Sequence, residues 1–142
     1  MAKKGRRGWV FSPDTGGVRI PEDVRRATTD RIEKYAAKHY SGCYTRLGLH
    51  FHGAFCYVDA FTAVEEPSKQ MLKSTGETRD EFVLRVSQIP IHLCRLRYFG
   101  PDRWSFGFYT YSNEQYSPCA FNNGTFFGTP EQAFEQSAGY LR

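Results

Sequence analysis

The chain has 142 residues, of which 40% are hydrophobic, so it is long enough to bury the core of one domain without metal or disulfides. No apolar run approaches the ~18 residues that a bilayer-spanning helix needs, so we expect no membrane-spanning segment. The formal net charge is +4.

The net charge comes entirely from the N-terminus. Four basic side chains lie there: Lys3, Lys4, Arg6 and Arg7. The remaining 15 basic side chains balance the 15 acidic ones. We therefore predict a basic flexible arm over residues 1–8 and a single α+β domain over residues 9–142. Such an arm can contact phosphates, or it can be a solvated end that only aids solubility.

The four cysteines are widely separated, at Cys43, Cys56, Cys94 and Cys119. None lies within four residues of another, so the chain lacks the paired-cysteine spacing of a zinc knuckle. The N-terminus also lacks the apolar stretch of a secretory signal. We therefore expect a cytoplasmic protein whose cysteines are reduced and pack in the core.

The first half of the chain predicts one helix and one hairpin. The helix begins at Pro21, which suits the first helical position, and ends near Gly42. Two alternating strands, 44–52 and 54–62, follow and are joined by a tight turn at Gly53-Ala54.

The second half has a similar order after residues 67–76, which carry no regular pattern. We predict, in chain order, a short helix, a second hairpin, a shorter strand and a last helix: 77–88, 91–99 with 104–111, 116–121, and from Thr129 onward. The two hairpins are alike, since Leu47–Gly53 aligns with Cys94–Gly100. This order predicts an α+β fold with an antiparallel sheet of four or five strands and helices mainly on one face. The strand order stays open.

Three segments of the second half carry a resemblance. They are His92–Gly100, the run Tyr109–Ser112 and the segment Gly128–Glu131. Together they resemble small uncharacterised bacterial proteins. The resemblance implies a bacterial, cytoplasmic source, and it brings no known activity.

Alternation along the strands divides the predicted sheet into two faces. The face assigned to the core carries Leu47, Leu49, Phe51, Cys56, Val58, Ala60, Cys94, Leu96, Tyr98, Ser105, Gly107 and Tyr109. The opposite face carries Arg46, His50, His52, Phe55, Tyr57, Asp59, Phe61, Arg95, Arg97, Phe99, Trp104, Phe106 and Phe108. Basic and aromatic side chains are therefore interleaved on one face. A slip of one residue in a strand would exchange its faces.

An interleaved basic and aromatic face favours single-stranded nucleic acid, because rings stack on bases and arginines hold phosphates. The candidate contacts are Arg46, Tyr57, Arg95, Arg97, Phe99, Trp104 and Phe106, with Lys3, Lys4, Arg6 and Arg7 of the arm. The same face can instead be covered by a helix, by Trp9-Val10-Phe11 or by a second subunit, or hold a small ligand. The leading hypothesis is a non-enzymatic binding module, and the alternative is a homodimer or protein-interaction scaffold.

A second alternative is a small metal-dependent enzyme. His50 and His52 point to one face of a strand, and Asp59 lies diagonally across from His50 on the next strand. Two histidines and a carboxylate can hold zinc or iron with open positions. His92 and Cys94 form a second pair, which can join them only if the hairpins are adjacent and the face assignments are wrong. The sequence contains no phosphate-binding loop, nucleophile elbow or dinucleotide fingerprint.

Overall fold

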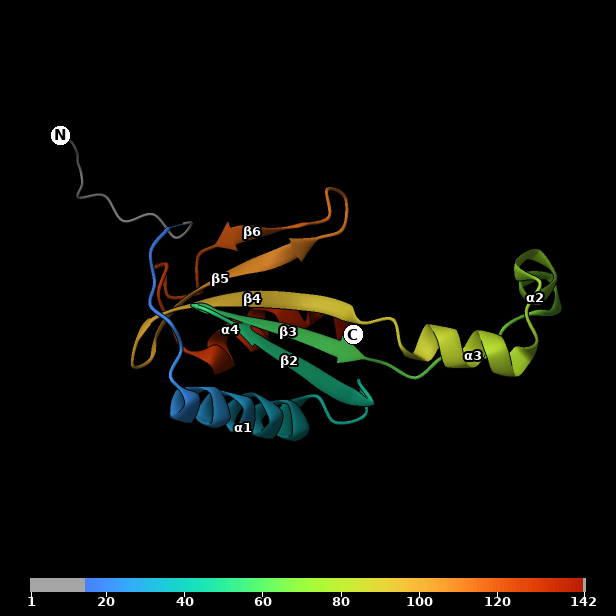
Figure 1. Ribbon diagram of the computed structural model, residues 1–142, viewed down its shortest axis with the longest axis horizontal. Helices are drawn as coiled ribbons and strands as arrows, with labels where there is room; N and C mark the ends of the chain where they lie inside the picture. Colours follow the sequence, from blue (N-terminus) through green and yellow to red (C-terminus); the bar gives the residue numbers. More distant parts are fainter. Residues whose placement is uncertain (1–14, 142) are drawn as a thin grey trace.

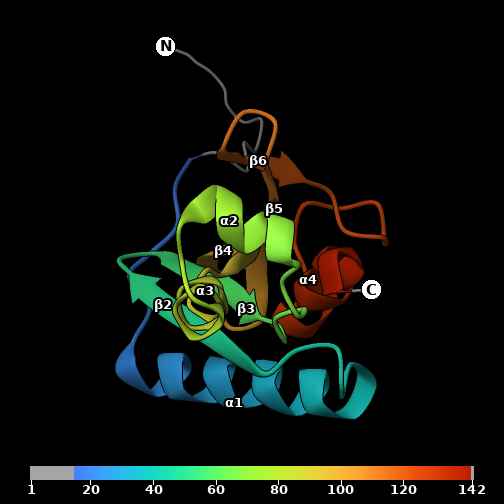
Figure 2. The same cartoon turned by 90° about the vertical axis from the view of Figure 1, so that its right-hand side faces the viewer.

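The computed structural model describes residues 15–141. In chain order the elements are α1 (Glu22–His39), β2 (Arg46–His52), β3 (Phe55–Phe61), α2 (Lys69–Thr75), α3 (Arg79–Ser87), β4 (Ile91–Gly100), β5 (Arg103–Thr110), β6 (Gln115–Cys119), α4 (Pro130–Ser137) and a final 3-10 turn, Ala138–Leu141. The strands form one antiparallel sheet in the order β2-β3-β4-β5-β6, with α1 and α4 on the same side (Figures 1 and 2). The predicted α+β class is confirmed.

Helix α1 follows its predicted boundaries closely. Pro21 is extended and precedes the helix, and Glu22 and Asp23 lie in the first turn, where their charges favour the helix dipole. Its buried residues recur every four positions, at Thr28, Ile32 and Ala36. This single apolar stripe is the face that packs on the sheet and on α4.

Helix α4 is also set by local signals. The Thr129 side chain accepts from the backbone N–H of Gln132, and the Gln132 side chain caps Thr129 in return. Ala133, Phe134 and Ser137 are buried. Because Phe134 lies in the core shared with α1, this helix completes the cover over one face of the sheet.

The second hairpin differs from its prediction in register. β4 and β5 are joined by a two-residue turn at Pro101-Asp102, and the pairing shifts between Tyr98 and Gly100, which leaves Phe99 in a bulge. The predicted four-residue loop is therefore wrong. The extra residue in β4 moves every side chain of β5 to the face opposite the one expected.

This shift corrects six face assignments. Trp104, Phe106 and Phe108 lie on the helix-covered side, whereas Ser105, Gly107 and Tyr109 lie on the other. Trp104 and Phe106 retain only 1% and 3% of their surface exposed. The reason is burial, because the register that places these large rings in the core removes far more apolar area from water than the alternative.

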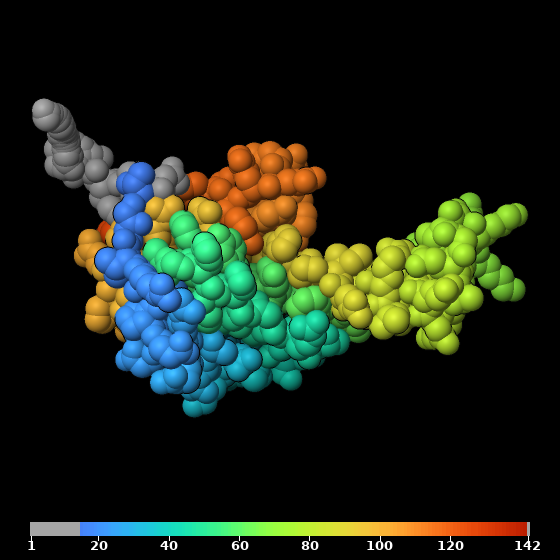
Figure 3. Space-filling view, in the orientation of Figure 1, coloured from blue at the N-terminus to red at the C-terminus, as the bar shows by residue number. Residues whose placement is uncertain are grey.

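Residues 62–90, which we call the helical projection, connect β3 to β4 and extend away from the end of the sheet (Figures 1 and 3). Helix α3 confirms the predicted helix over 77–88 and begins at Thr78, which forms a capping box with Glu81. Helix α2 was not predicted. It is capped by Ser68 and ends at Gly76, whose left-handed backbone closes the last turn.

The four cysteines are free, and Cys56 and Cys94 are buried as expected. No helix between residues 15 and 141 has both the length and the apolar character of a membrane span. The predicted basic arm and the Trp9-Val10-Phe11 segment lie outside the described residues.

Candidate nucleic-acid interface on the open sheet face

The face of the sheet opposite α1 and α4, which we call the open face, is organised in rows across the strands. One row contains His52, Phe55 and Arg97, followed by Ser105. The next contains His50, Tyr57 and Arg95, followed by Gly107 and Pro118. The third contains Gly48, Asp59 and His92. Tyr109 and Tyr116 pair with each other on the adjoining strands β5 and β6.

The arginines of the open face stack on its rings. The Arg95 guanidinium lies 4.6 Å from the centre of the Phe55 ring and 5.3 Å from that of Tyr116. Arg97 lies 4.7 Å from the same Phe55 ring, and Arg46 lies 3.6 Å from Phe61 at the end of the face. Stacking of this kind fixes each guanidinium against an aromatic surface.

The aromatic rings also contact one another. Tyr116 lies edge-on to Tyr57, with ring centres 5.7 Å apart, and to Tyr109, at 5.1 Å. His92 lies 4.6 Å from Tyr109. Burial raises the pKa of the Tyr116 hydroxyl, so this ring stays neutral over the physiological range. The result is a continuous, half-buried aromatic surface across four strands.

The open face is positively charged. Asp59 is the one carboxylate within the five strands, and its Oδ1 lies 2.8 Å from Nδ1 of His92. Three arginines, Arg46, Arg95 and Arg97, therefore share the face with a single acid that already has a partner. A surface of this sign attracts polyanions.

The predicted nucleic-acid contacts do not all lie on the accessible part of this face. Arg46, Tyr57 and Arg95 do. Trp104 and Phe106 lie in the core, and the shift of β5 described above removes them from the interface.

Arg97 and Phe99 lie where the N-terminal segment meets the sheet. Arg97 is 9% exposed, and its Nη1 donates to the carbonyl of Gly16 at 3.4 Å. Phe99 is half-buried and lies edge-on to Phe127, 5.2 Å away. Both side chains therefore pack against neighbouring segments of the chain and present little free surface. The arm residues Lys3, Lys4, Arg6 and Arg7 lie outside the described residues.

Phe55, Tyr109 and Tyr116 complete the surface but were missing from the candidate contacts. The strand alternation predicts the correct face for Phe55. It predicts the core face for Tyr109, which is wrong because the bulge at Phe99 shifts the register of β5. Tyr116 depends on the pairing of β6 with β5. The signal in the sequence is Pro101-Asp102, which can form a two-residue turn. This turn pairs Gly100 with Arg103, and the pairing of Tyr98 with Trp104 then leaves Phe99 without a partner in β5.

The proposed metal ligands are not brought together. His50 lies beside Tyr57, with ring centres 6.0 Å apart, whereas Asp59 pairs with His92. Between residues 15 and 141, no group of three or more His, Cys, Asp or Glu side chains is arranged to hold a metal ion.

The two buried cysteines, Cys56 and Cys94, lack the features of a nucleophile. Burial raises the pKa of the Cys94 thiol to about 12 and that of Cys56 well above its ordinary value. The thiolate is the reactive form of cysteine, so both thiols are expected to be unreactive in the folded protein.

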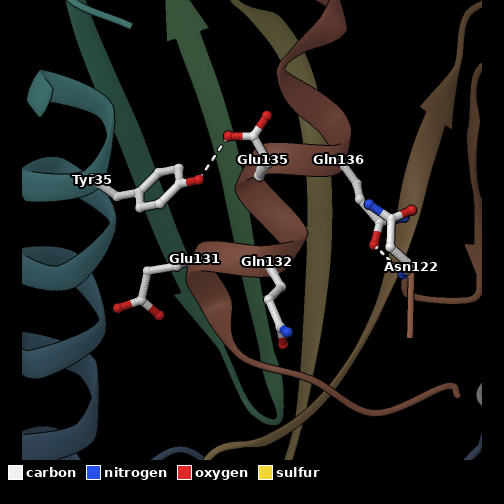
Figure 4. Close-up of a pocket in the computed structure, with 6 residues that line it drawn as sticks. All are labelled: Tyr35, Asn122, Glu131, Gln132, Glu135 and Gln136. Carbon is white, nitrogen blue, oxygen red and sulfur yellow. Dashed lines mark hydrogen bonds between the residues drawn. The ribbon is translucent and has the colours of Figure 1, made fainter. Parts of the chain in front are cut away.

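A second polar region lies between α1 and α4, where a hollow of about 180 Å³ is lined by Tyr35, Asn122, Glu131, Gln132, Glu135 and Gln136 (Figure 4). Ligand pockets are commonly about 300–1,000 Å³. Glu135 accepts from the hydroxyls of Tyr35 and Tyr40 at 2.6 and 2.5 Å. Glu131 accepts two hydrogen bonds from Arg31, at 2.9 and 2.7 Å. Both carboxylates thus join α1 to α4, and we interpret the hollow as part of a structural clamp.

No protein-family model, curated protein or solved structure matches the chain.

Proposed function

We propose that the open face binds single-stranded nucleic acid without sequence readout. Tyr57 and Tyr116 supply the rings on which bases stack, Phe55 supports the Arg95 guanidinium, and Arg46 and Arg95 meet the phosphates. The observation that carries the proposal is the placement of arginines on rings across a face whose one carboxylate is paired with His92.

Base stacking and phosphate contacts on such a face supply enough binding free energy for micromolar affinity. Each base stacked on an aromatic side chain contributes about 1–3 kcal/mol. Two or three stacked bases, with a few phosphate contacts, therefore reach the roughly −8 kcal/mol that corresponds to micromolar affinity. Because the arginines are positioned by the rings beneath them, little side-chain entropy is lost on binding.

The test is fluorescence anisotropy of labelled single-stranded RNA and DNA with the full chain at low and physiological salt. We expect Arg95→Gln and Tyr57→Ala each to weaken binding about tenfold, and Arg95→Gln also to flatten the salt dependence. Arg85→Gln is the matched control, because it removes the same charge from helix α3, where Arg85 is paired with Glu77. It should bind like the parent.

A further variant separates the face from the arm. Replacing Lys3, Lys4, Arg6 and Arg7 by Ser in the full chain removes the N-terminal charge. Binding at physiological salt that survives this change supports the open face as the site. Binding that is lost with the arm and unaffected by Arg95→Gln and Tyr57→Ala contradicts the proposal.

A further inference from the structure

Two exposed tyrosines lie beside one end of the open face. Tyr111 follows β5, and Tyr140 belongs to the 3-10 turn after α4. They keep 47% and 43% of their surface exposed, and their ring centres lie 5.6 Å apart, edge to face. Single exposed apolar residues are common on protein surfaces, whereas adjoining ones are typical of binding surfaces.

Both rings are held in place by hydrogen bonds to the sheet. The Tyr111 hydroxyl accepts from the backbone N–H of His92 at 2.8 Å. The Tyr140 hydroxyl donates to the backbone carbonyl of Tyr109, also at 2.8 Å. Because the two rings are positioned before any ligand binds, little side-chain entropy would be lost when a ligand stacks on them.

Ring contacts connect this pair to the rest of the open face. Tyr111 lies edge-on to Tyr109, with ring centres 4.8 Å apart. Tyr109 contacts Tyr116, and Tyr116 contacts Tyr57. Consecutive ring contacts, none longer than 5.7 Å, therefore lead from Tyr57 on β3 across β6 and β5 to Tyr140.

We propose that Tyr111 and Tyr140 continue the stacking surface of the open face, so that its substrates are runs of several unpaired nucleotides and not mononucleotides or single bases. Domains that bind single strands without sequence preference contact about 4–16 nucleotides. Tyr57 and Tyr116, together with the exposed pair, provide stacking rings for the lower end of that range. This inference rests on the function proposed for the open face.

The dependence of affinity on oligonucleotide length tests the inference. Fluorescence anisotropy is measured with the full chain and labelled oligothymidylates of about three and about ten nucleotides. We expect Tyr111→Ala and Tyr140→Ala each to weaken binding of the longer strand at least about fivefold, because a stacked base is lost. Binding of the shorter strand should change less than about twofold, since it needs only the rings beside the arginines.

Tyr111→Phe and Tyr140→Phe are the matched controls. Each removes the hydroxyl and its hydrogen bond to the sheet but keeps the ring, so both should bind the longer strand like the parent. Near-ultraviolet circular dichroism reports whether each variant is folded, through the buried Trp104.

The outcomes separate this inference from the proposed function. If the parent binds the longer strand through Arg95, and both alanine variants bind it equally well, the inference is overturned and the proposed function stands. Equal weakening in the alanine and phenylalanine variants also overturns the inference, because the hydroxyls and not the rings would then matter. A parent that binds neither strand overturns the proposed function and this inference together.

Discussion

Asp59 and His92 face each other across strands β3 and β4, with Oδ1 of Asp59 2.8 Å from Nδ1 of His92. The pair lies at one end of the open face, where β3 and β4 connect to the helical projection. Tyr109 lies against the imidazole, and the Tyr111 hydroxyl accepts from the His92 backbone N–H at 2.8 Å. This arrangement gives the one carboxylate of the sheet a structural partner, and within residues 15–141 neither Arg46 nor Arg95 forms an ion pair.

Asp59→Asn is therefore expected to strengthen binding of single-stranded nucleic acid, by about two- to fivefold at low salt, because it removes the one negative charge from the face. Anisotropy with the same oligonucleotides measures the change. Asp80→Asn removes an equal charge from the exposed start of α3 and should have no effect. Equal affinities for the parent and both variants would argue against binding on the open face.

The register of β5 can be tested at Gly107. A Cβ built at this position would lie 2.8 Å from the carbonyl oxygen of Ser117 on β6. Gly107→Ala should therefore push β5 and β6 apart and lower the free energy of unfolding by about 1–3 kcal/mol. Urea unfolding provides the measurement. Gly139→Ala, where a Cβ meets nothing within 4 Å, should change stability much less.

The clamp between α1 and α4 predicts a dependence of stability on alkaline pH. The hydrogen bond to Glu135 raises the pKa of Tyr35 to about 12, against an ordinary value of 10. The folded protein thus holds this proton more tightly than the unfolded chain, so the stabilisation is complete below pH 10 and is lost as the pH rises toward 12. Denaturant titrations of the parent and Tyr35→Phe should converge over this range. A constant difference between them would show that the clamp does not act through this proton.

Thiol reactivity tests the placement of the cysteines. Cys56 and Cys94 are buried and their thiol pKa values are raised, so a disulfide reagent should modify them only when the protein unfolds. Cys43 and Cys119 are partly exposed and should react first. Mass spectrometry of labelled peptides identifies the sites, with the denatured chain as the control. Rapid native labelling of Cys94 would contradict its position under α4.

Elements set by local signals were predictable from the sequence. Helix α1 has its proline at the start and one apolar stripe, and Thr78 and Thr129 each begin a helix through a capping box. The first hairpin has a two-residue turn at Gly53-Ala54 and keeps the expected register, with His52 opposite Phe55. In each case neighbouring residues carry all the information required.

Features that depend on distant residues were not predictable in the same way. Alternation groups Trp104, Phe106 and Phe108 on one face, but the match to the first hairpin does not reveal the bulge at Phe99, so it assigns that group to the wrong side of the sheet. The sequence places Asp59 near His50 because it does not reveal which strand lies on the other side of β3, and the pairing of β3 with β4 gives Asp59 the partner His92 instead. Helix α2 has no apolar stripe, so it left no periodic signal.

The most direct test of the central claim is ultraviolet cross-linking of labelled single-stranded RNA to the full chain at physiological salt, followed by mapping of the modified peptides. We predict cross-links on the peptides that contain Tyr57 and Tyr116, the two accessible rings that lie 5.7 Å apart on the open face, and their loss in Arg95→Gln. Cross-links confined to residues 1–8 or to the helical projection would contradict the account.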